Sequence, residues 1–438
     1  MIKIFSFLIL ITGVLMGNSL PKYYTKTLEN GLQVVVIPMK NDSNVITTDI
    51  FYNVGSGDEV MGKSGIAHML EHMNFKSTKN LKAGEFDKIV KGFGGVNNAS
   101  TGFDQTHYYI KSSSQNLSKS LELFAELMQN LNLKDEEFQP ERNVVLEERY
   151  WRTDNNPMGY LYFRLFNNAF VYSSYHWTPI GFIDDIKNWS IDDIKEFHKR
   201  FYQPQNAVIV VAGDIEPQEV FKESQKHFGK IKNTTKKIKR NHQVEPKQDG
   251  AKRFYITNKE SASQMLAIAY HIPDFKSKDQ VALSAISEIL SSGKSSRLNS
   301  LLVDNKKLVS TVYAYNMENK NPNIFLFMAL CNPGVDAEEV EKIILDEIEK
   351  LKTTDMTKEE LDKLKLQTRS DFIFSMQDSS SLADMFGSYF VKGDIEPLLK
   401  YEENLDKLTT KDIKEVAKRY FTKDNSTTVI LRYKGENR

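Results

Sequence analysis

DIKEFHKRFYQPQNAVIVV, at residues 193–211, is matched by DIKEVAKRYFTKDNSTTVI at residues 412–430. The two copies share acidic, basic, aromatic and apolar residues at a constant offset of 219 residues, about half of the 438-residue chain. A match of this kind without a gap indicates an internal duplication. The sequence therefore predicts two similar domains, each ending in a helix followed by a buried strand.

The composition is that of a globular protein with enough apolar material for real cores. Apolar residues make up 40% of the chain and charged residues 26%. Lysine plus arginine equals aspartate plus glutamate, at 58 each. No overall field therefore draws the chain toward nucleic acid or anionic lipid, and no nucleic-acid partner is expected.

The first domain is expected to mix sheet and helices. Two strand-like runs flank the Asn30-Gly31 hairpin signal within residues 23–39, and another strand run covers residues 45–54. Helical spacing occurs at residues 64–75, 118–132, 135–152 and 191–202, and residues 207–212 are typical of a buried strand. We expect a first domain over residues 20–230, an exposed polar linker over 231–252, and a second domain over 253–438. The basic stretch Lys236–Arg240 in this linker is interpreted as a solvated tether, with an anion site as the alternative.

The N-terminus is typical of a signal peptide. Met1-Ile2-Lys3 precedes an apolar run from Ile4 to Met16 and the small-residue segment Gly17-Asn18-Ser19. We expect residues 1–19 to be removed, giving an exported, periplasmic protein without a stable membrane span, although an uncleaved anchor or a buried strand would fit the same run. Cys331 is the only cysteine, which excludes an intramolecular disulfide and a cysteine-rich metal site.

The pentapeptide His68-Met69-Leu70-Glu71-His72 carries the chemistry. Residues three and four apart lie on one face of a helix, so both imidazoles and the Glu71 carboxylate can project to one point. Two nitrogens at that spacing can hold one Zn²⁺, and Glu71 can act as the base that activates a water molecule. The alternative is a helix with two ordinary, hydrogen-bonded histidines.

A catalytic zinc needs a third protein ligand. Glu141 and Glu148 lie seven residues apart on the predicted helix 135–152, two turns along one face. Glu148 can reach the metal while Glu141 supports a ligand from behind. Taken alone these acids are equally typical of a solvated helix face, as expected for the neighbouring Glu147.

These residues resemble the insulinase and pitrilysin family of zinc peptidases, in which the motif inverts the common His-Glu-x-x-His order. The resemblance covers nearly the whole mature chain and rests on Gly55-Ser56, Glu59, Gly65 to Thr78, Asn98 to Thr101, Glu141 to Glu148 and Ser295 to Leu298. It implies that Glu148, rather than Glu147, completes the zinc site. It also implies that Asn98, Ala99 and Phe75 contact the substrate, the first two from an edge strand.

The resemblance implies an α+β fold with two duplicated domains, each a mostly antiparallel sheet covered by helices, facing each other. It implies a zinc-dependent metalloendopeptidase that hydrolyses peptides or unfolded polypeptides bound as an added strand in an enclosed chamber. Chambers of this family enclose substrate between four such domains. We therefore expect this chain to pair with itself or with a related chain.

The second half departs from the zinc motif. At the offset of the repeat, positions 68 and 72 correspond to Ser287 and Ser291. An Arg and a Tyr that many relatives carry after the Ser-Arg-Leu segment are replaced by Val303 and Ser310. Another residue or a partner subunit would have to supply those contacts, so a catalytically weak peptide-binding or partner subunit is the alternative function. A zinc hydrolase for a non-peptide amide or ester is the third possibility.

Overall fold

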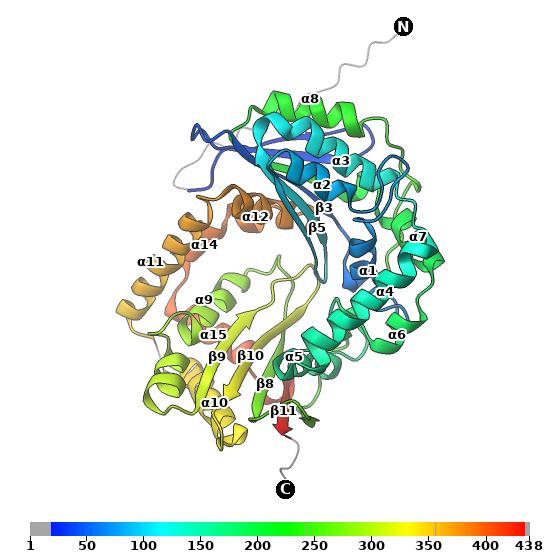
Figure 1. Ribbon diagram of the computed structural model, residues 1–438. Coiled ribbons are helices and arrows are strands. Elements are labelled where there is room, and N and C mark those ends of the chain that lie inside the picture. The colour runs from blue at the N-terminus through cyan, green and yellow to red at the C-terminus, as the bar shows by residue number, and fades with distance from the viewer. Residues whose placement is uncertain (1–18, 242, 355, 434–438) are drawn as a thin grey trace.

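The computed structural model describes residues 19–241, 243–354 and 356–433. The chain forms two sheets with their helices, and together these elements have a ring-like outline (Figure 1). Within the described residues the first sheet has six strands and the second has five. The strands of the first sheet are β1 (Tyr24–Thr27), β2 (Gln33–Pro38), β3 (Val45–Tyr52), β4 (Val96–Thr101), β5 (Thr106–Ser113) and β6 (Ala207–Gly213). Those of the second sheet are β7 (Lys252–Asn258), β8 (Met265–Ile272), β9 (Val309–Asn316), β10 (Asn323–Cys331) and β11 (Ser426–Tyr433).

The two sheets have the same topology. The first has the order β1-β2-β6-β3-β5-β4 and the second has the order β7-β11-β8-β10-β9. In each sheet one pair is parallel, β2 with β6 inside the first sheet and β7 with β11 at the edge of the second, while the other pairs are antiparallel. Residues 193–211 and 412–430 occupy the same place in both. The expected α+β fold with two mostly antiparallel sheets is confirmed.

In both halves one or more helices precede a strand hairpin and several helices follow it before the last strand of the sheet. The first half contains α1 (Ile66–Met73), α2 (Glu85–Gly92), α3 (Leu117–Gln129), α4 (Asp135–Arg149), α5 (Pro157–Ala169), α6 (Ile183–Asn188), α7 (Ile191–Phe201) and α8 (Pro217–Phe228). The second half contains α9 (Gln280–Ser291), α10 (Ala337–Thr353), α11 (Lys358–Ser375), α12 (Ser379–Lys392), α13 (Glu396–Leu399), α14 (Tyr401–Lys407) and α15 (Thr410–Tyr420). No helix in these described segments is long and apolar enough to cross a membrane. The expected signal peptide lies outside the described residues, apart from Ser19.

The repeated segment begins each time with the same helix start. Ser190 and Thr409 each accept a hydrogen bond from the backbone N–H three residues later, at Asp193 and Asp412. In turn, each aspartate carboxylate accepts a hydrogen bond from the backbone N–H of its cap residue. These reciprocal capping boxes satisfy donors that a helix end leaves free, which explains why the shared residues start α7 and α15.

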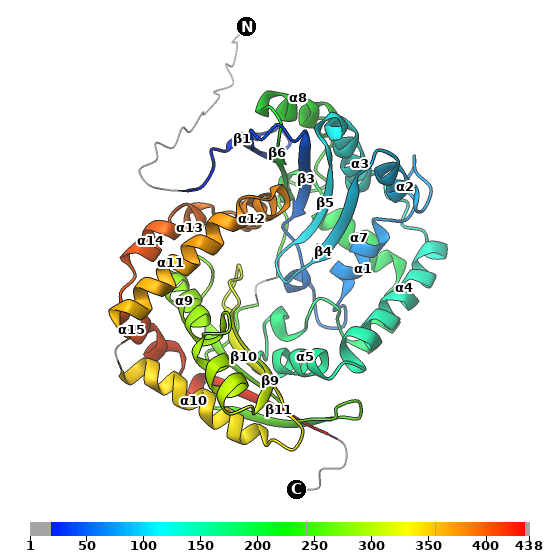
Figure 2. The ribbon, with the colours of Figure 1, turned by 60° about the vertical axis from the view of Figure 1, so that its left-hand side comes forward.

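Each half gives one helix to the sheet of the other half. Leu161, Leu165 and Phe166 of α5 pack on the second sheet, against residues of β8, β10 and β11. In return, Leu382 and Phe386 of α12 pack on β2, β3 and β6 of the first sheet. Figure 2 shows α12 beside the first sheet and α5 beside the second. Two buried apolar clusters thus join the halves.

The approach of α12 to the first sheet requires a glycine. A Cβ atom at Gly387 would lie 2.1 Å from a ring atom of Phe51, which a folded chain does not tolerate. At the start of the helix the Ser379 hydroxyl lies 2.8 Å from that of Thr47, and the Lys111 ammonium lies 2.6 Å from Asp378. Packing and polar contacts therefore fix α12 on the sheet that carries the candidate site.

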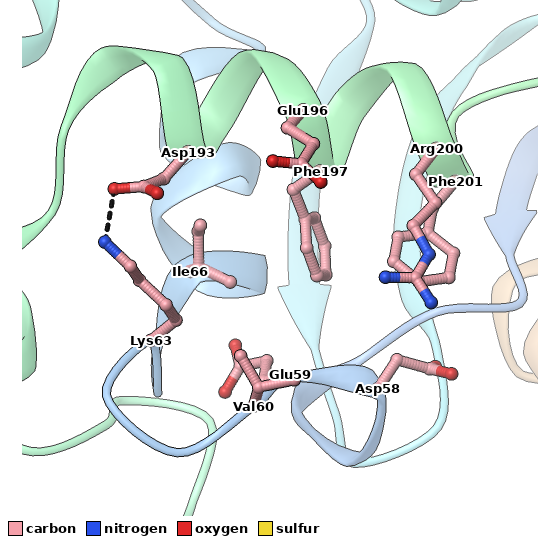
Figure 3. Close-up of a pocket in the computed structure, with 10 residues that line it drawn as sticks. All are labelled: Asp58, Glu59, Val60, Lys63, Ile66, Asp193, Glu196, Phe197, Arg200 and Phe201. Atoms are coloured by element: carbon pink, nitrogen blue, oxygen red, sulfur yellow. Dashed lines mark hydrogen bonds and ion pairs between the residues drawn. The ribbon is translucent and has the colours of Figure 1, made fainter. Parts of the chain in front are cut away.

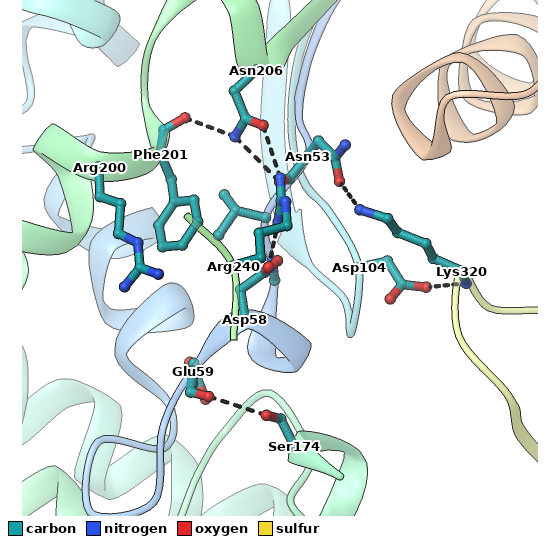
Figure 4. A network of polar contacts seen from close by, with 12 residues as sticks. Asn53, Asp58, Glu59, Asp104, Ser174, Arg200, Phe201, Asn206, Arg240 and Lys320 are labelled. Carbon is teal, nitrogen blue, oxygen red and sulfur yellow. Dashed lines mark hydrogen bonds and ion pairs between the residues drawn. The ribbon is translucent and has the colours of Figure 1, made fainter. Parts of the chain in front are cut away.

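Polar contacts also connect the halves at the β9–β10 turn and along the linker (Figure 4). Lys320 donates from its ammonium to Asn53, at 2.9 Å, and from its backbone to Asp104, at 2.7 Å. Arg240 pairs with Asp58 and donates to Asn206. The lysines of the basic stretch 236–240 are therefore exposed, whereas its last residue, Arg240, is bound to residues of the first half.

Candidate active site

Helix α1 presents its apolar residues to the first sheet and its polar motif outward. Ala67, Met69, Leu70 and Met73 are buried in the core of the first half. His68, Glu71 and His72 lie on the other face, as their spacing predicts. The helix starts after Gly65, whose φ of 84° favours glycine, and a Cβ there would lie 2.7 Å from the carbonyl oxygen of Ile180.

Glu59 holds the first turn of α1 from inside the protein. Its side chain is 1% exposed, and its two oxygens accept the backbone N–H groups of Gly65 and Ala67, each at 2.8 Å. The indole N–H of Trp177 is a third donor, at 2.7 Å. Burial raises the pKa of Glu59 to about 8, although all three donors favour the charged form. The carboxylate thus satisfies two of the free donors at the helix start, next to His68.

Three predicted residues converge on one point. One ligand atom each of His68, His72 and Glu148 lies within 4.8 Å of the others. The Nε2 atoms of His68 and His72 lie 3.8 Å and 3.4 Å from the two Glu148 oxygens. Zinc ligands at about 2.0–2.2 Å in a tetrahedron lie roughly 3.3–3.6 Å from one another. The spacing, the donor types and the partial burial of this set fit Zn²⁺.

The electrostatics of the two histidines differ. Burial and the neighbouring His72 lower the pKa of His68 to about 4, so this ring is neutral and can donate a lone pair. Burial also disfavours the charged form of His72, but hydrogen bonds to Glu141 and Glu148 outweigh it and raise its pKa to about 9. A cation bound at Nε2 would take the place of that proton.

Glu141 supports His72 from behind. Its Oε1 lies 2.8 Å from Nδ1 of His72, and its Oε2 lies 2.5 Å from the Lys76 ammonium. A metal-binding histidine usually donates its other ring N–H to such a carboxylate, which fixes the orientation of the ring. The Nδ1 atom of His68, by contrast, is buried without a hydrogen-bond partner among the described residues.

Glu71 points toward strand β4 rather than toward Glu148. It accepts a hydrogen bond from the Thr101 hydroxyl, at the end of β4. Burial raises the pKa of Glu71, against the lowering effect of the Thr101 bond. A carboxylate with a raised pKa beside a metal site is suited to accept a proton near neutral pH.

Two of the three predicted substrate contacts lie on the strand whose last residue, Thr101, bonds to Glu71. Asn98 and Ala99 are on β4, an edge strand of the first sheet in the described structure. Phe75 follows α1 and its ring packs at 5.6 Å from Phe86 and 6.0 Å from Tyr108. Figure 2 shows α1 between β4 and α4, so the strand edge and Glu148 flank the motif helix.

The second half has no comparable site at the positions of the repeat. Ser287 and Ser291 lie on α9, and both hydroxyls donate to the carbonyl oxygen of Ala314. Val303 packs against the second core and Ser310 is exposed on β9. These side chains offer none of the nitrogen and carboxylate ligands that zinc prefers.

A cavity of about 110 Å³ lies on the other side of α1 from the triad. Figure 3 shows it between α7 and the loop after η1 (Ser56–Asp58), with the ion pair of Lys63 and Asp193 at one end. His68, His72, Glu71 and Glu148 are not among its lining residues. The candidate active site is therefore the triad of His68, His72 and Glu148 and not this cavity.

Three features of the site did not follow from the sequence. Thr101 and Lys76 lie in segments that stand out in the sequence only by their resemblance to the family. Their spacing does not indicate that they contact Glu71 and Glu141. Helix α4 continues into a π-helical turn, η3 (Tyr150–Asp154), which places Arg152 with its Nε at 3.1 Å from Glu148. A helix prediction over residues 135–152 could not distinguish the two helix types, because a five-residue turn is too short to show a period of its own.

Comparison with known proteins identifies the family. The family model "Insulinase (Peptidase family M16)" matches residues 34–170, and the model "Peptidase M16 inactive domain" matches residues 188–368. The zinc protease PqqE of Helicobacter pylori is 54% identical over 414 residues, which cover 94% of this chain and 93% of that protein. The chain belongs to the M16 peptidase family. It is an insulinase-family zinc peptidase, and its metal is Zn²⁺.

Solved M16 structures share this architecture. A crystal structure of a protease from Helicobacter pylori has a TM-score of 0.93 and 54% identity, and the match covers 94% of this chain and 100% of that chain. The periplasmic protease PqqL from Escherichia coli has a TM-score of 0.77 at 19% identity, covering 94% of this chain but 47% of that chain. The second likeness concerns the fold alone.

Proposed function

We propose that this M16 peptidase is an endopeptidase that cleaves unfolded polypeptides bound as an added strand along β4. The observation that carries the proposal is the convergence of His68, His72 and Glu148 next to a β-strand edge, with Glu71 bonded to that edge through Thr101. An exposed edge offers free backbone donors and acceptors, so it can pair with a peptide of almost any sequence. Asn98 and Ala99 would make those backbone contacts, and the Phe75 ring would line the space beside them.

In this proposal His68, His72 and Glu148 hold the zinc, and Glu141 fixes the His72 ring through Nδ1. When bound there, zinc would supply a water of lowered pKa and would polarise the scissile carbonyl. Glu71 accepts the proton of the attacking water and passes it to the leaving amine. Thr101 holds the Glu71 carboxylate at the strand edge where that amine would lie.

The ligand assignment is testable with a matched pair of variants, Glu148→Gln and Glu147→Gln. The two residues are neighbours on α4, but only Glu148 contacts the histidines. We expect Glu148→Gln to lose bound zinc and hydrolysis of a quenched fluorescent peptide mixture, while Glu147→Gln retains both. Equal zinc content and activity in the two variants would contradict the assignment. Mass spectrometry of the products tests for peptide-bond cleavage, as opposed to hydrolysis of another amide or ester.

We further propose that the chain is exported to the periplasm and works as a dimer, either with itself or with a related chain. Export is supported by the signal-like residues 1–19 and by the likeness in fold to PqqL of Escherichia coli, which is a periplasmic protease. Pairing is supported by the length of PqqL, of which this fold covers 47%, so that a second copy would complete a chain of that size. Light scattering that shows only monomer at working concentration would count against pairing.

A second candidate is a peptide-binding or partner subunit with weak activity of its own. It is favoured by Val303 and Ser310, which stand where many relatives have an Arg and a Tyr. Peptide hydrolysis by the purified chain, with and without chelator, separates the candidates. Activity that appears only with a co-purifying related chain would favour this second one.

A further inference from the structure

An exposed apolar stripe borders the metal-binding carboxylate on helix α4. Val144 lies four residues before Glu148 and Trp151 lies three residues after it, so all three share one side of the helix. Val144 is 49% exposed and Trp151 is 73% exposed. Single exposed apolar side chains are common on protein surfaces, so what distinguishes these two is their position beside a metal ligand. Here the stripe is continuous with the catalytic centre because Glu148 lies within it.

The backbone that presents Trp151 is held rigidly. Trp151 lies in the π-helical turn η3, a type of turn that is rare and frequent at functional sites. The buried Arg149 donates to both oxygens of Asp154, at 2.9 and 3.2 Å, and its guanidinium lies 3.8 Å from the centre of the Phe163 ring. These contacts clamp the two ends of the turn together, so the position of Trp151 does not depend on its own side-chain contacts.

Two neighbouring segments support the same turn. A Cβ at Gly159 would lie 2.0 Å from the carbonyl oxygen of Arg152, so glycine is required for α5 to pack against it. From the second half, the Asn258 amide donates to the carbonyl oxygen of Asp154, at 3.1 Å. A large side chain on a fixed backbone loses little entropy when it binds, which makes it an effective contact residue.

Charge completes the surface. The Arg152 side chain is 65% exposed, and its guanidinium lies 3.1 Å from Glu148 and 6.0 Å from the centre of the Trp151 ring. It therefore stands at the edge of the apolar stripe, where it would repel a lysine or arginine side chain. An aromatic or large aliphatic side chain would meet no such penalty.

We propose that Val144 and Trp151 form a specificity-determining subsite, which accepts an aromatic or large apolar side chain of the substrate and disfavours a basic one. The inference rests on the proposed binding of a peptide between β4 and α4. The motif helix α1 contacts both β4 and α4 (Figure 2), and Glu148 of α4 lies beside the two histidines, so a peptide paired with β4 and reaching the metal would also approach α4. Side chains that point away from β4 would then meet this stripe.

The test uses three quenched fluorescent peptides that differ at one position near the cleaved bond, with Phe, Ala or Lys. We expect Trp151→Ala to lower the ratio of kcat/KM for the Phe peptide to that for the Ala peptide about tenfold, and Trp151→Phe to retain most of it. The Tyr172→Ala variant removes another exposed aromatic side chain, 62% exposed and distant in sequence from the motifs, and should leave the ratio unchanged. Arg152→Gln should raise kcat/KM for the Lys peptide relative to the Ala peptide.

A binding measurement keeps this result separate from the proposed function. In the Glu71→Gln background, the Trp151→Ala change should weaken binding of the Phe peptide more than binding of the Ala peptide, with unchanged zinc content. An equal loss for all peptides, or no loss, overturns the subsite. A change in oligomeric state without a change in the peptide ratio also overturns it, because the stripe would then be an assembly surface. If the unmodified chain cleaves no peptide, the proposed function is contradicted. The ratio of the affinities for the Phe and Ala peptides still tests the subsite.

Discussion

Replacing Glu59 tests whether a buried carboxylate remote from the metal sets the position of a metal ligand. Glu59→Ala leaves three buried donors without an acceptor: two N–H groups at the start of α1 and the indole of Trp177. Each unsatisfied donor costs about 1–3 kcal/mol, and because the three share one site we expect a total loss of about 3–5 kcal/mol. His68 lies in the first turn of the same helix, so fraying there should weaken zinc binding by about tenfold or more.

The milder variant Glu59→Gln separates folding from metal binding. Its single amide oxygen can replace the acceptor shared by Gly65 and Trp177, but its amide group would face the N–H of Ala67. We expect an intermediate loss of about 1–3 kcal/mol, a folded protein, and reduced zinc affinity in a competition assay with a chelating dye. Glu122→Ala, which removes an exposed carboxylate of a surface ion pair, is the control and should change neither quantity. If Glu59→Gln bound zinc as tightly as the unmodified protein, with the same melting temperature, the positioning argument would be wrong.

Four further predictions concern the chemistry and the contact between the halves. Glu71→Gln should retain zinc and lower kcat by about 10²–10⁴-fold, measured by metal analysis and peptide hydrolysis; removal of zinc by a chelator should abolish hydrolysis in the unmodified protein, and added Zn²⁺ should restore it. Thr101→Val should move the acid limb of the pH profile of kcat/KM to higher pH, whereas Thr101→Ser should not. The reason is that the hydroxyl lowers the pKa of Glu71, and the base works only when deprotonated, so activity is lost as pH falls through that pKa. Gly387→Val should destabilise both halves in thermal unfolding, because it separates α12 from Phe51; unfolding of the second half alone would contradict the role of α12.

The predicted elements that followed from the sequence are those with strong local signals. The helix at 64–75 is observed as α1, and residues 207–212 lie in β6 as expected. Each segment has an apolar pattern typical of one kind of element and a glycine at one end, so its local sequence is sufficient to predict the element. The duplicated topology could be predicted because the capping and packing residues of α7 recur in α15.

The exchange of helices between the halves could not be predicted. The apolar residues of α5 indicate a buried helix, but periodicity does not show which sheet buries it. Leu161 and Phe166 would fit the core of the first half equally well by residue type. Likewise, Thr101 lies in a polar strand that gives no local sign of contact with Glu71, since that bond depends on the packing of α1 against β4. The residues that contact a site from other elements are determined by the tertiary fold, whereas the motif His68 to His72 is visible in the local sequence.

The helix exchange places a constraint on how the site can move. The metal ligands and the strand edge belong to the first half, yet the first sheet is covered on one face by α12 of the second half, and η3 is held by Asn258 of the second half. Both contacts bury apolar or hydrogen-bonded groups that would have to be exposed if the halves separated. Opening within one chain is therefore costly. We therefore expect substrate binding to leave the relative position of the two halves unchanged.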